Sequence, residues 1–92
     1  MQFTRKLRKP ISNGQLTTSI RIWKKPHVKV GSRYKMGDGH IEVTSIREIG
    51  MHDITEQMAR ESGFDGIVDL LKTAKHGDGR IIYFIRFRYL NS

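Results

Sequence analysis

The fold is decided by the stretch Arg80-Ile81-Ile82-Tyr83-Phe84-Ile85-Arg86-Phe87-Arg88-Tyr89-Leu90, which is dominated by apolar, β-branched and aromatic residues. Such residues favour a pleated, half-buried strand. Because successive side chains of a strand point to opposite faces, one face would carry Ile81, Tyr83, Ile85, Phe87 and Tyr89. The other face would carry Ile82, Phe84, Arg86, Arg88 and Leu90. We therefore predict a strand over residues 80–90.

Three segments upstream are also predicted to be strands, at residues 17–23, 34–36 and 40–49. In the first, Thr18, Ile20 and Ile22 alternate with Thr17, Ser19, Arg21 and Trp23. In the third, Ile41, Val43 and Ser45 alternate with Glu42, Thr44 and Ile46. The turn Gly37-Asp38-Gly39 between the second and third predicts a tight hairpin.

Three segments are predicted to be helical. Phe3, Leu7 and Ile11 recur at the spacing of one helix face. Asp53 or Thr55 could cap a second helix, which ends near Gly63. A third helix is indicated by the periodic apolar residues Ile67, Val68, Leu70, Leu71 and Ala74, and it ends at His76-Gly77. Together, these strands and helices predict one α+β domain over residues 1–92. Its small mixed or antiparallel sheet would curl into a barrel, with the helices packed on it.

The distribution of charge favours an anionic partner. The formal net charge is +8. Residues 1–37 contain ten Lys and Arg and no acid, whereas residues 38–92 contain seven Lys and Arg and nine Asp and Glu. A one-sided positive field of this kind attracts polyanions such as RNA. Alternatively, the basic residues form a solvated surface, or they meet an acidic protein.

Several chemistries are excluded or disfavoured by composition. The chain contains no cysteine, which excludes disulfides, a thiolate nucleophile and cysteine zinc sites. Its longest apolar run, residues 81–85, is far shorter than the ~20 residues that a bilayer-spanning helix needs. The four histidines lack ligand spacing, so we expect no metal and no cofactor. We expect a cytoplasmic protein with no membrane partner, and the sequence does not indicate an oligomeric state.

Three segments together resemble the ASCH family, a branch of the PUA-like β-barrels. They are Gly14-Gln15-Leu16-Thr17-Thr18-Ser19-Ile20-Arg21, then Asp53-Ile54-Thr55-Glu56 through Ala59-Arg60-Glu61-Ser62-Gly63-Phe64, and finally Tyr83-Phe84-Ile85-Arg86-Phe87. The resemblance implies a small bacterial single-domain member with a PUA-like barrel and two or three helices. It also implies that RNA binds in a cleft between barrel and helices. Some members remove the acetyl group from N4-acetylcytidine, and some are reported to be ribonucleases.

The chain departs from the family pattern where the chemistry would lie. Gly14 and Arg21 match the signature near the first strand, but Leu16 occupies the position of the catalytic lysine. Ser62 occupies the position of the helical glutamate. Amide hydrolysis needs an activated nucleophile and a tuned base, and leucine supplies neither. The remaining candidates for a hydrolytic role are Ser19, Lys24 and Glu61. The resemblance therefore implies binding of RNA, single-stranded nucleic acid or a nucleotide, with hydrolysis as the alternative.

The candidate binding residues are mostly basic. We expect phosphate contacts from Arg21, Lys24, Lys25, Lys29, Arg33 and Arg86. We expect stacking from Trp23 and polar contacts from Thr17 and Ser19. The structural alternatives are that Arg21 pairs with an acid such as Glu42 or Glu61, that Trp23 packs in the core, and that Arg86 is a solvated edge charge.

Overall fold

The computed structural model describes residues 3–74 and 79–91. Its elements, in chain order, are α1 (Arg5–Ser12), β1 (Thr18–Trp23), β2 (Arg33–Met36), β3 (Gly39–Ile49), a 3-10 turn η1 (Met51–Asp53), α2 (Glu56–Glu61), α3 (Ile67–Thr73) and β4 (Ile81–Leu90). Every helix and strand predicted from the sequence is present, with ends that differ by a few residues. The predicted end of α3 at His76-Gly77 and the turn at Asp78 lie outside the described residues.

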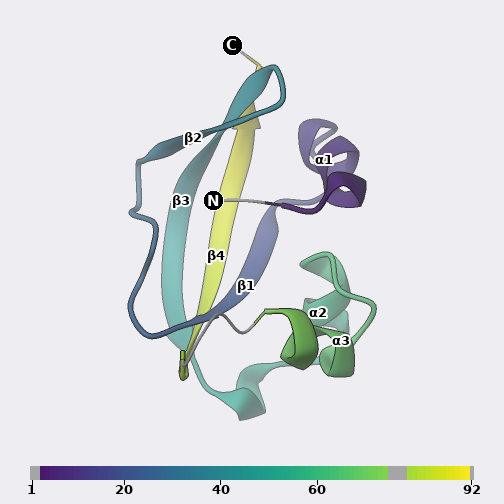
Figure 1. Ribbon diagram of the computed structural model, residues 1–92, viewed down its shortest axis with the longest axis vertical. Helices are drawn as coiled ribbons and strands as arrows, with labels where there is room; N and C mark the ends of the chain where they lie inside the picture. The colour runs from purple at the N-terminus through teal and green to yellow at the C-terminus, as the bar shows by residue number, and fades with distance from the viewer. Residues whose placement is uncertain (1–2, 75–78, 92) are drawn as a thin grey trace.

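The four strands form one curled antiparallel sheet in the order β1-β4-β3-β2 (Figure 1). β4 lies in the centre, paired with β1 on one side and β3 on the other. The α+β class and the antiparallel pairing are thus confirmed. β1 and β2 are the two edge strands, so the sheet is a half-barrel rather than the barrel predicted from the sequence.

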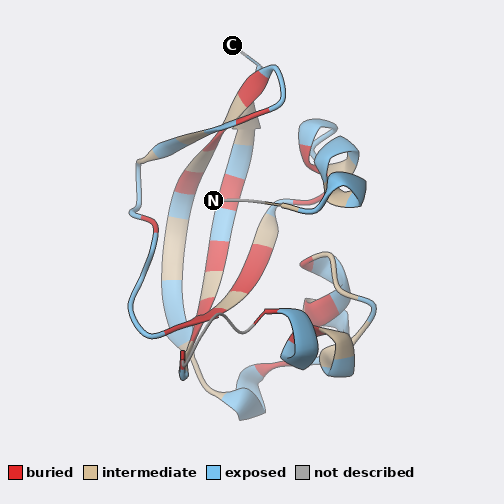
Figure 2. Ribbon diagram, in the orientation of Figure 1, coloured by how far each residue is buried: buried red, intermediate tan, exposed pale blue. Residues whose placement is uncertain are grey.

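Residues from both faces of β4 belong to the core. Figure 2 shows the buried residues along this strand in red. On one face, Ile82 and Phe84 pack with Ile20 and Ile22 of β1 beneath α2 and α3. On the other face, Tyr83 and Ile85 pack with a cluster that includes Val28 of the β1–β2 loop, and Phe87 packs with Ile11 of α1. α1 and the pair α2–α3 consequently cover opposite faces of the sheet.

A β-bulge at Thr44 corrects one predicted face. Val43 is opposite Phe87, but the next paired residue, Ser45, is opposite Arg86. The inserted residue shifts the alternation by one, as a bulge does. Ile46 therefore packs on the same side as Val43, and the prediction that placed Ile46 with Glu42 and Thr44 is wrong.

The candidate caps before α2 both make local hydrogen bonds. The Thr55 hydroxyl accepts a hydrogen bond of 3.1 Å from the Met58 N–H, so Thr55 is the N-cap of α2. The Asp53 carboxylate instead accepts one of 2.9 Å from the Gly50 N–H and closes η1.

Among the described residues, no helix is long and apolar enough to cross a membrane.

One carboxylate joins the three strands β2, β3 and β4. Glu42 accepts a hydrogen bond of 3.2 Å from Arg33 Nε and one of 2.7 Å from Arg88 Nε, and its side chain is only 15% exposed. The two guanidinium groups, Arg88 first and Arg33 second, hold the pKa of Glu42 below its ordinary value of 4.5. Glu42 is thus a cross-strand structural contact.

We predict that Glu42 makes the fold acid-sensitive. A lowered pKa in the folded state gives stability that is present above the unfolded pKa and lost as the pH falls through the folded value. The thermal unfolding midpoint of the Glu42→Gln variant should therefore be lower at neutral pH. It should also fall less steeply than that of the unmodified protein as the pH drops below 4.5. Circular dichroism measures the unfolding midpoint of each protein at each pH. Midpoints that fall in parallel with pH for the two proteins would contradict this role.

Candidate functional site

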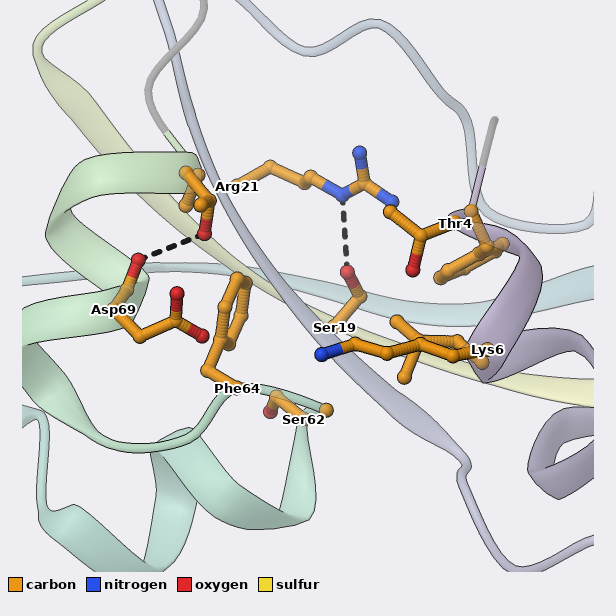
Figure 3. A pocket seen from close by; sticks show the side chains of 12 residues that line it. Thr4, Lys6, Ser19, Arg21, Ser62, Phe64 and Asp69 are labelled. Atoms are coloured by element: carbon orange, nitrogen blue, oxygen red, sulfur yellow. Dashed lines mark hydrogen bonds between the residues drawn. The ribbon is translucent and has the colours of Figure 1, made fainter.

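A pocket of about 420 Å³ opens beside the edge strand β1 and is lined by residues of β1, α1, α3 and the turn after α2 (Figure 3). Its volume lies within the range of small-molecule sites, roughly 300–1,000 Å³. The polar groups around it are Thr4, Lys6, Ser19, Arg21, Ser62, Asp69 and Thr73. The apolar wall includes Phe3, Leu7 and Phe64. We call this hollow the β1 pocket.

The β1 strand brings two predicted residues together in this pocket. Arg21 Nε donates a hydrogen bond of 3.0 Å to the hydroxyl of Ser19, two residues away on the same strand face. Ser19 is 2% exposed, and the Arg21 guanidinium lies 5.1 Å from the ring centre of Phe3. Burial lowers the pKa of Arg21. Because arginine titrates so far above neutrality, the group stays charged.

Ser62, a pocket residue at the end of α2, contacts β1 through a pair of hydroxyl groups. The oxygens of Thr18 and Ser62 lie 3.0 Å apart, and the Thr18 hydroxyl donates to the carbonyl of Glu61 at 3.2 Å. Ser62 is 3% exposed, so its hydroxyl is a buried and hydrogen-bonded group. This contact ties the end of α2 to β1.

Lys6 is a pocket residue that the sequence analysis missed. It enters from α1, with its ammonium directed into the hollow, and Asp69 of α3 enters from the opposite side (Figure 3). The Asp69 carboxylate accepts a hydrogen bond of 2.9 Å from the Asp65 N–H. The helical pattern could have indicated Lys6. It immediately precedes Leu7 and therefore flanks the apolar face of the predicted helix.

The other predicted basic residues lie outside the β1 pocket. Lys24, Lys25 and Lys29 are exposed on the loop that leads from β1 across to β2. Arg33 is held by Glu42, as described above. Arg86 is exposed on β4, with its guanidinium 5.6 Å from the ring centre of Phe84.

The predicted stacking residue is part of the core. Trp23 is 5% exposed and clusters with Val28, Tyr83 and their neighbours. His27 stacks on its ring with the centroids 4.7 Å apart, and the Tyr83 ring lies 6.0 Å away. A base could reach the Trp23 ring only if these neighbours moved, so the aromatic groups offered by the β1 pocket are Phe3 and Phe64 instead.

Three further candidates are also placed. Thr17 is exposed just before β1 and lies outside the β1 pocket. Glu61 is exposed on α2 and accepts a hydrogen bond of 3.0 Å from the amide of Gln57. Leu16 is 7% exposed and packs in the cluster beneath α1. Within residues 3–74 and 79–91, no group of three or more His, Cys, Asp or Glu is arranged to hold a metal ion.

Comparisons with known proteins give no match. No family model, no curated protein and no solved structure is significantly similar to this chain. The geometry of the β1 pocket and the charge distribution are therefore the basis for a functional proposal.

We predict that Gly63 fixes the pocket wall. Its φ of +92° favours glycine, and an added Cβ would lie 3.0 Å from both terminal methyl groups of Leu7. Gly14, with a φ of +77° and nothing within 4 Å of such a Cβ, is a matched control. A left-handed conformation costs a non-glycine residue about 1–3 kcal/mol, so both alanine variants should be destabilised in urea unfolding.

At Gly63 alone, the close approach of the added Cβ to Leu7 should lower the free energy of unfolding further. Gly63→Ala should therefore lower the free energy of unfolding by more than Gly14→Ala. Equal losses would mean that Leu7 moves aside freely and that α1 is not packed firmly against the turn after α2.

Proposed function

We propose that the β1 pocket binds a segment of single-stranded nucleic acid, most directly RNA, or a nucleotide. The observation that carries the proposal is the Arg21–Ser19 hydrogen bond beside Lys6, in a pocket large enough for a small organic ligand. Among the described lining residues, two cations from different elements face one acid, Asp69, so the charge of these residues is positive. A phosphate group is the anion that such a pair of cations suits.

The pocket also has the two kinds of wall that a nucleotide needs. Arginine binds phosphate oxygens through its planar fork, and lysine binds them as a point charge. Phe3 and Phe64 supply aromatic surface close to those cations. Single-stranded nucleic acids are bound by this combination of positive groove and stacking rings. The excess of positive charge in residues 1–37 would draw a polyanion toward the same half of the chain.

Membership of the ASCH family, with a PUA-like fold, is part of the same proposal. Two of the three segments that carry the resemblance meet at the β1 pocket. Ser19 and Arg21 come from the first segment, and Ser62, Gly63 and Phe64 come from the second. That two of these segments contribute residues to one hollow supports the proposal.

Hydrolysis of a modified nucleoside or of RNA is the alternative, and the lining favours it less. Of the candidates Ser19, Lys24 and Glu61, only Ser19 lines the pocket. The Ser19 hydroxyl accepts a hydrogen bond from a guanidinium, which can neither take up its proton nor act as a general base at neutral pH. Among the residues that the structure describes, Lys6 is the lysine that lines the pocket, and no glutamate lines it.

We predict that the pocket cations carry part of the salt dependence of RNA binding. Binding of a fluorescent single-stranded RNA should weaken with added salt because phosphate contacts release counterions. The double variant Lys6→Gln and Arg21→Gln should bind more weakly. The slope of log affinity against log salt should be shallower by about 1.4, since each contact on a single strand contributes about 0.7.

A variant with the same change of net charge provides the control. Lys35 of β2 and Arg47 of β3 are exposed and lie outside the β1 pocket. Replacing both with glutamine should leave the slope nearly unchanged. Equal effects of the two double variants in fluorescence anisotropy would show that only net charge matters, and would remove the pocket from the proposal.

We also predict that N4-acetylcytidine stays intact when it is incubated with the protein and followed by chromatography. Release of cytidine would contradict the binding role and indicate a hydrolase. In that case Lys6→Gln should abolish the release, because Lys6 places an ammonium group in the pocket.

A further inference from the structure

Helix α1 carries a concentration of cations that the proposed pocket uses only in part. Arg5, Lys6, Arg8 and Lys9 are all exposed. Within the described part of the chain, Arg33, Arg60 and Arg88 form ion pairs with carboxylates, and none of the four α1 cations does. The four α1 side chains therefore keep their charge available for an external anion.

Helix geometry spreads these four cations across the whole exposed side of α1. Phe3, Leu7 and Ile11 define the face that packs on the sheet. At about 100° per residue, Arg5 and Lys9 lie opposite that face, on the outward ridge. Lys6 lies on one flank and Arg8 lies on the other, each about 80° from the ridge. The charges thus form a continuous arc from one side of the helix to the other.

Each end of the arc leads into a pocket. Lys6 lines the β1 pocket. On the opposite flank, a second pocket of about 400 Å³ lies between the C-terminal half of α1, the β2–β3 turn and the end of β4. Its lining comprises Arg8, Lys9, Ser12, Gly37, Asp38, Tyr89 and Asn91. We call it the α1 back pocket.

The α1 back pocket resembles the first in chemistry. It combines two cations, a serine hydroxyl, one acid and one aromatic residue. Tyr89 is half-buried, and its hydroxyl donates a hydrogen bond of 3.4 Å to the Met36 carbonyl; Tyr89, Arg8 and Lys9 all line this pocket. The pairing of cations with an aromatic ring suits a nucleotide unit of a single strand.

We propose that one single-stranded nucleic acid runs from the β1 pocket over the cationic ridge of α1 into the α1 back pocket. This inference rests on the proposed function and specifies its ligand. The ligand is an oligonucleotide rather than a free nucleotide, because the path crosses a helix about 10–12 Å in diameter. The phosphates over the ridge contact Arg5 and Lys9, and those at the two ends contact Lys6 and Arg8.

The experiment measures affinity against ligand length by fluorescence anisotropy. The probes are oligouridylates of increasing length, with uridine monophosphate as a competitor. The affinity of the unmodified protein should rise with length and level off within the range of about 4–16 nucleotides known for single-strand sites of small domains. Oligomers that bind no better than the monophosphate would overturn the path and leave the β1 pocket in place. Failure of both probes to bind would overturn the proposed function as well.

The matched variants separate the path from the pocket. Arg8→Gln with Lys9→Gln should weaken binding of long oligomers, lower their salt slope by about 1.4, and leave competition by the monophosphate unchanged. Lys6→Gln with Arg21→Gln should weaken both ligands. If the Arg8 and Lys9 variant weakens neither ligand, or both equally, the path is wrong. Competition by polyglutamate as effective as that by an oligomer of equal charge would identify an acidic protein surface as the partner instead.

Discussion

The pairing of β4 with both of its neighbours is the constraint on which the rest of the structure depends. Ile85, at the centre of β4, is fully buried, and it lies between Ser19 of β1 and Ile46 of β3. A slip of one residue in this pairing would turn every side chain of a neighbouring strand to the opposite face. The register therefore places Arg21 opposite Tyr83 and directs Arg21 and Ser19 into the β1 pocket. The candidate site is in this sense a consequence of the core.

The β1 pocket exists because β1 is an edge strand with helices on either side of it. α1 packs on one face of the sheet and α2–α3 on the other, so a hollow is left where both overhang β1. The backbone hydrogen-bonding groups on the exposed edge of β1 are partly paired, because the Ile22 N–H donates a hydrogen bond of 3.1 Å to the Ala74 carbonyl. Ninety-two residues provide little volume for a deep cavity. A shallow pocket lined by strand and helix residues is what these residues can offer to a ligand.

Local sequence patterns predicted the helices and strands. Contacts between residues far apart in the sequence determined the features that these patterns could not predict. The alternation in β4, the glycines of the β2–β3 turn and the Thr55 cap each act within a few residues, so the sequence reveals them. The bulge at Thr44 depends on pairing with β4, which is why Ile46 was assigned to the wrong face. The position of Lys6 in the pocket depends on how α1 packs on the sheet, and the burial of Trp23 depends on the β1–β2 loop folding over it. Charge counts identified the basic half of the chain. They could not show whether the basic residues of α1 or those of the β1–β2 loop line the pocket.

We propose that nucleic acid binds at β1 and α1 rather than at the basic loop between β1 and β2. The most direct measurement is a titration of the ¹⁵N-labelled protein with single-stranded RNA, followed by amide chemical shifts. We expect the largest shift changes at Ser19, Arg21 and Phe64, with smaller ones at Lys24, Lys25 and Lys29. Changes confined to those three lysines and their neighbours would place the site on the loop and exclude the β1 pocket.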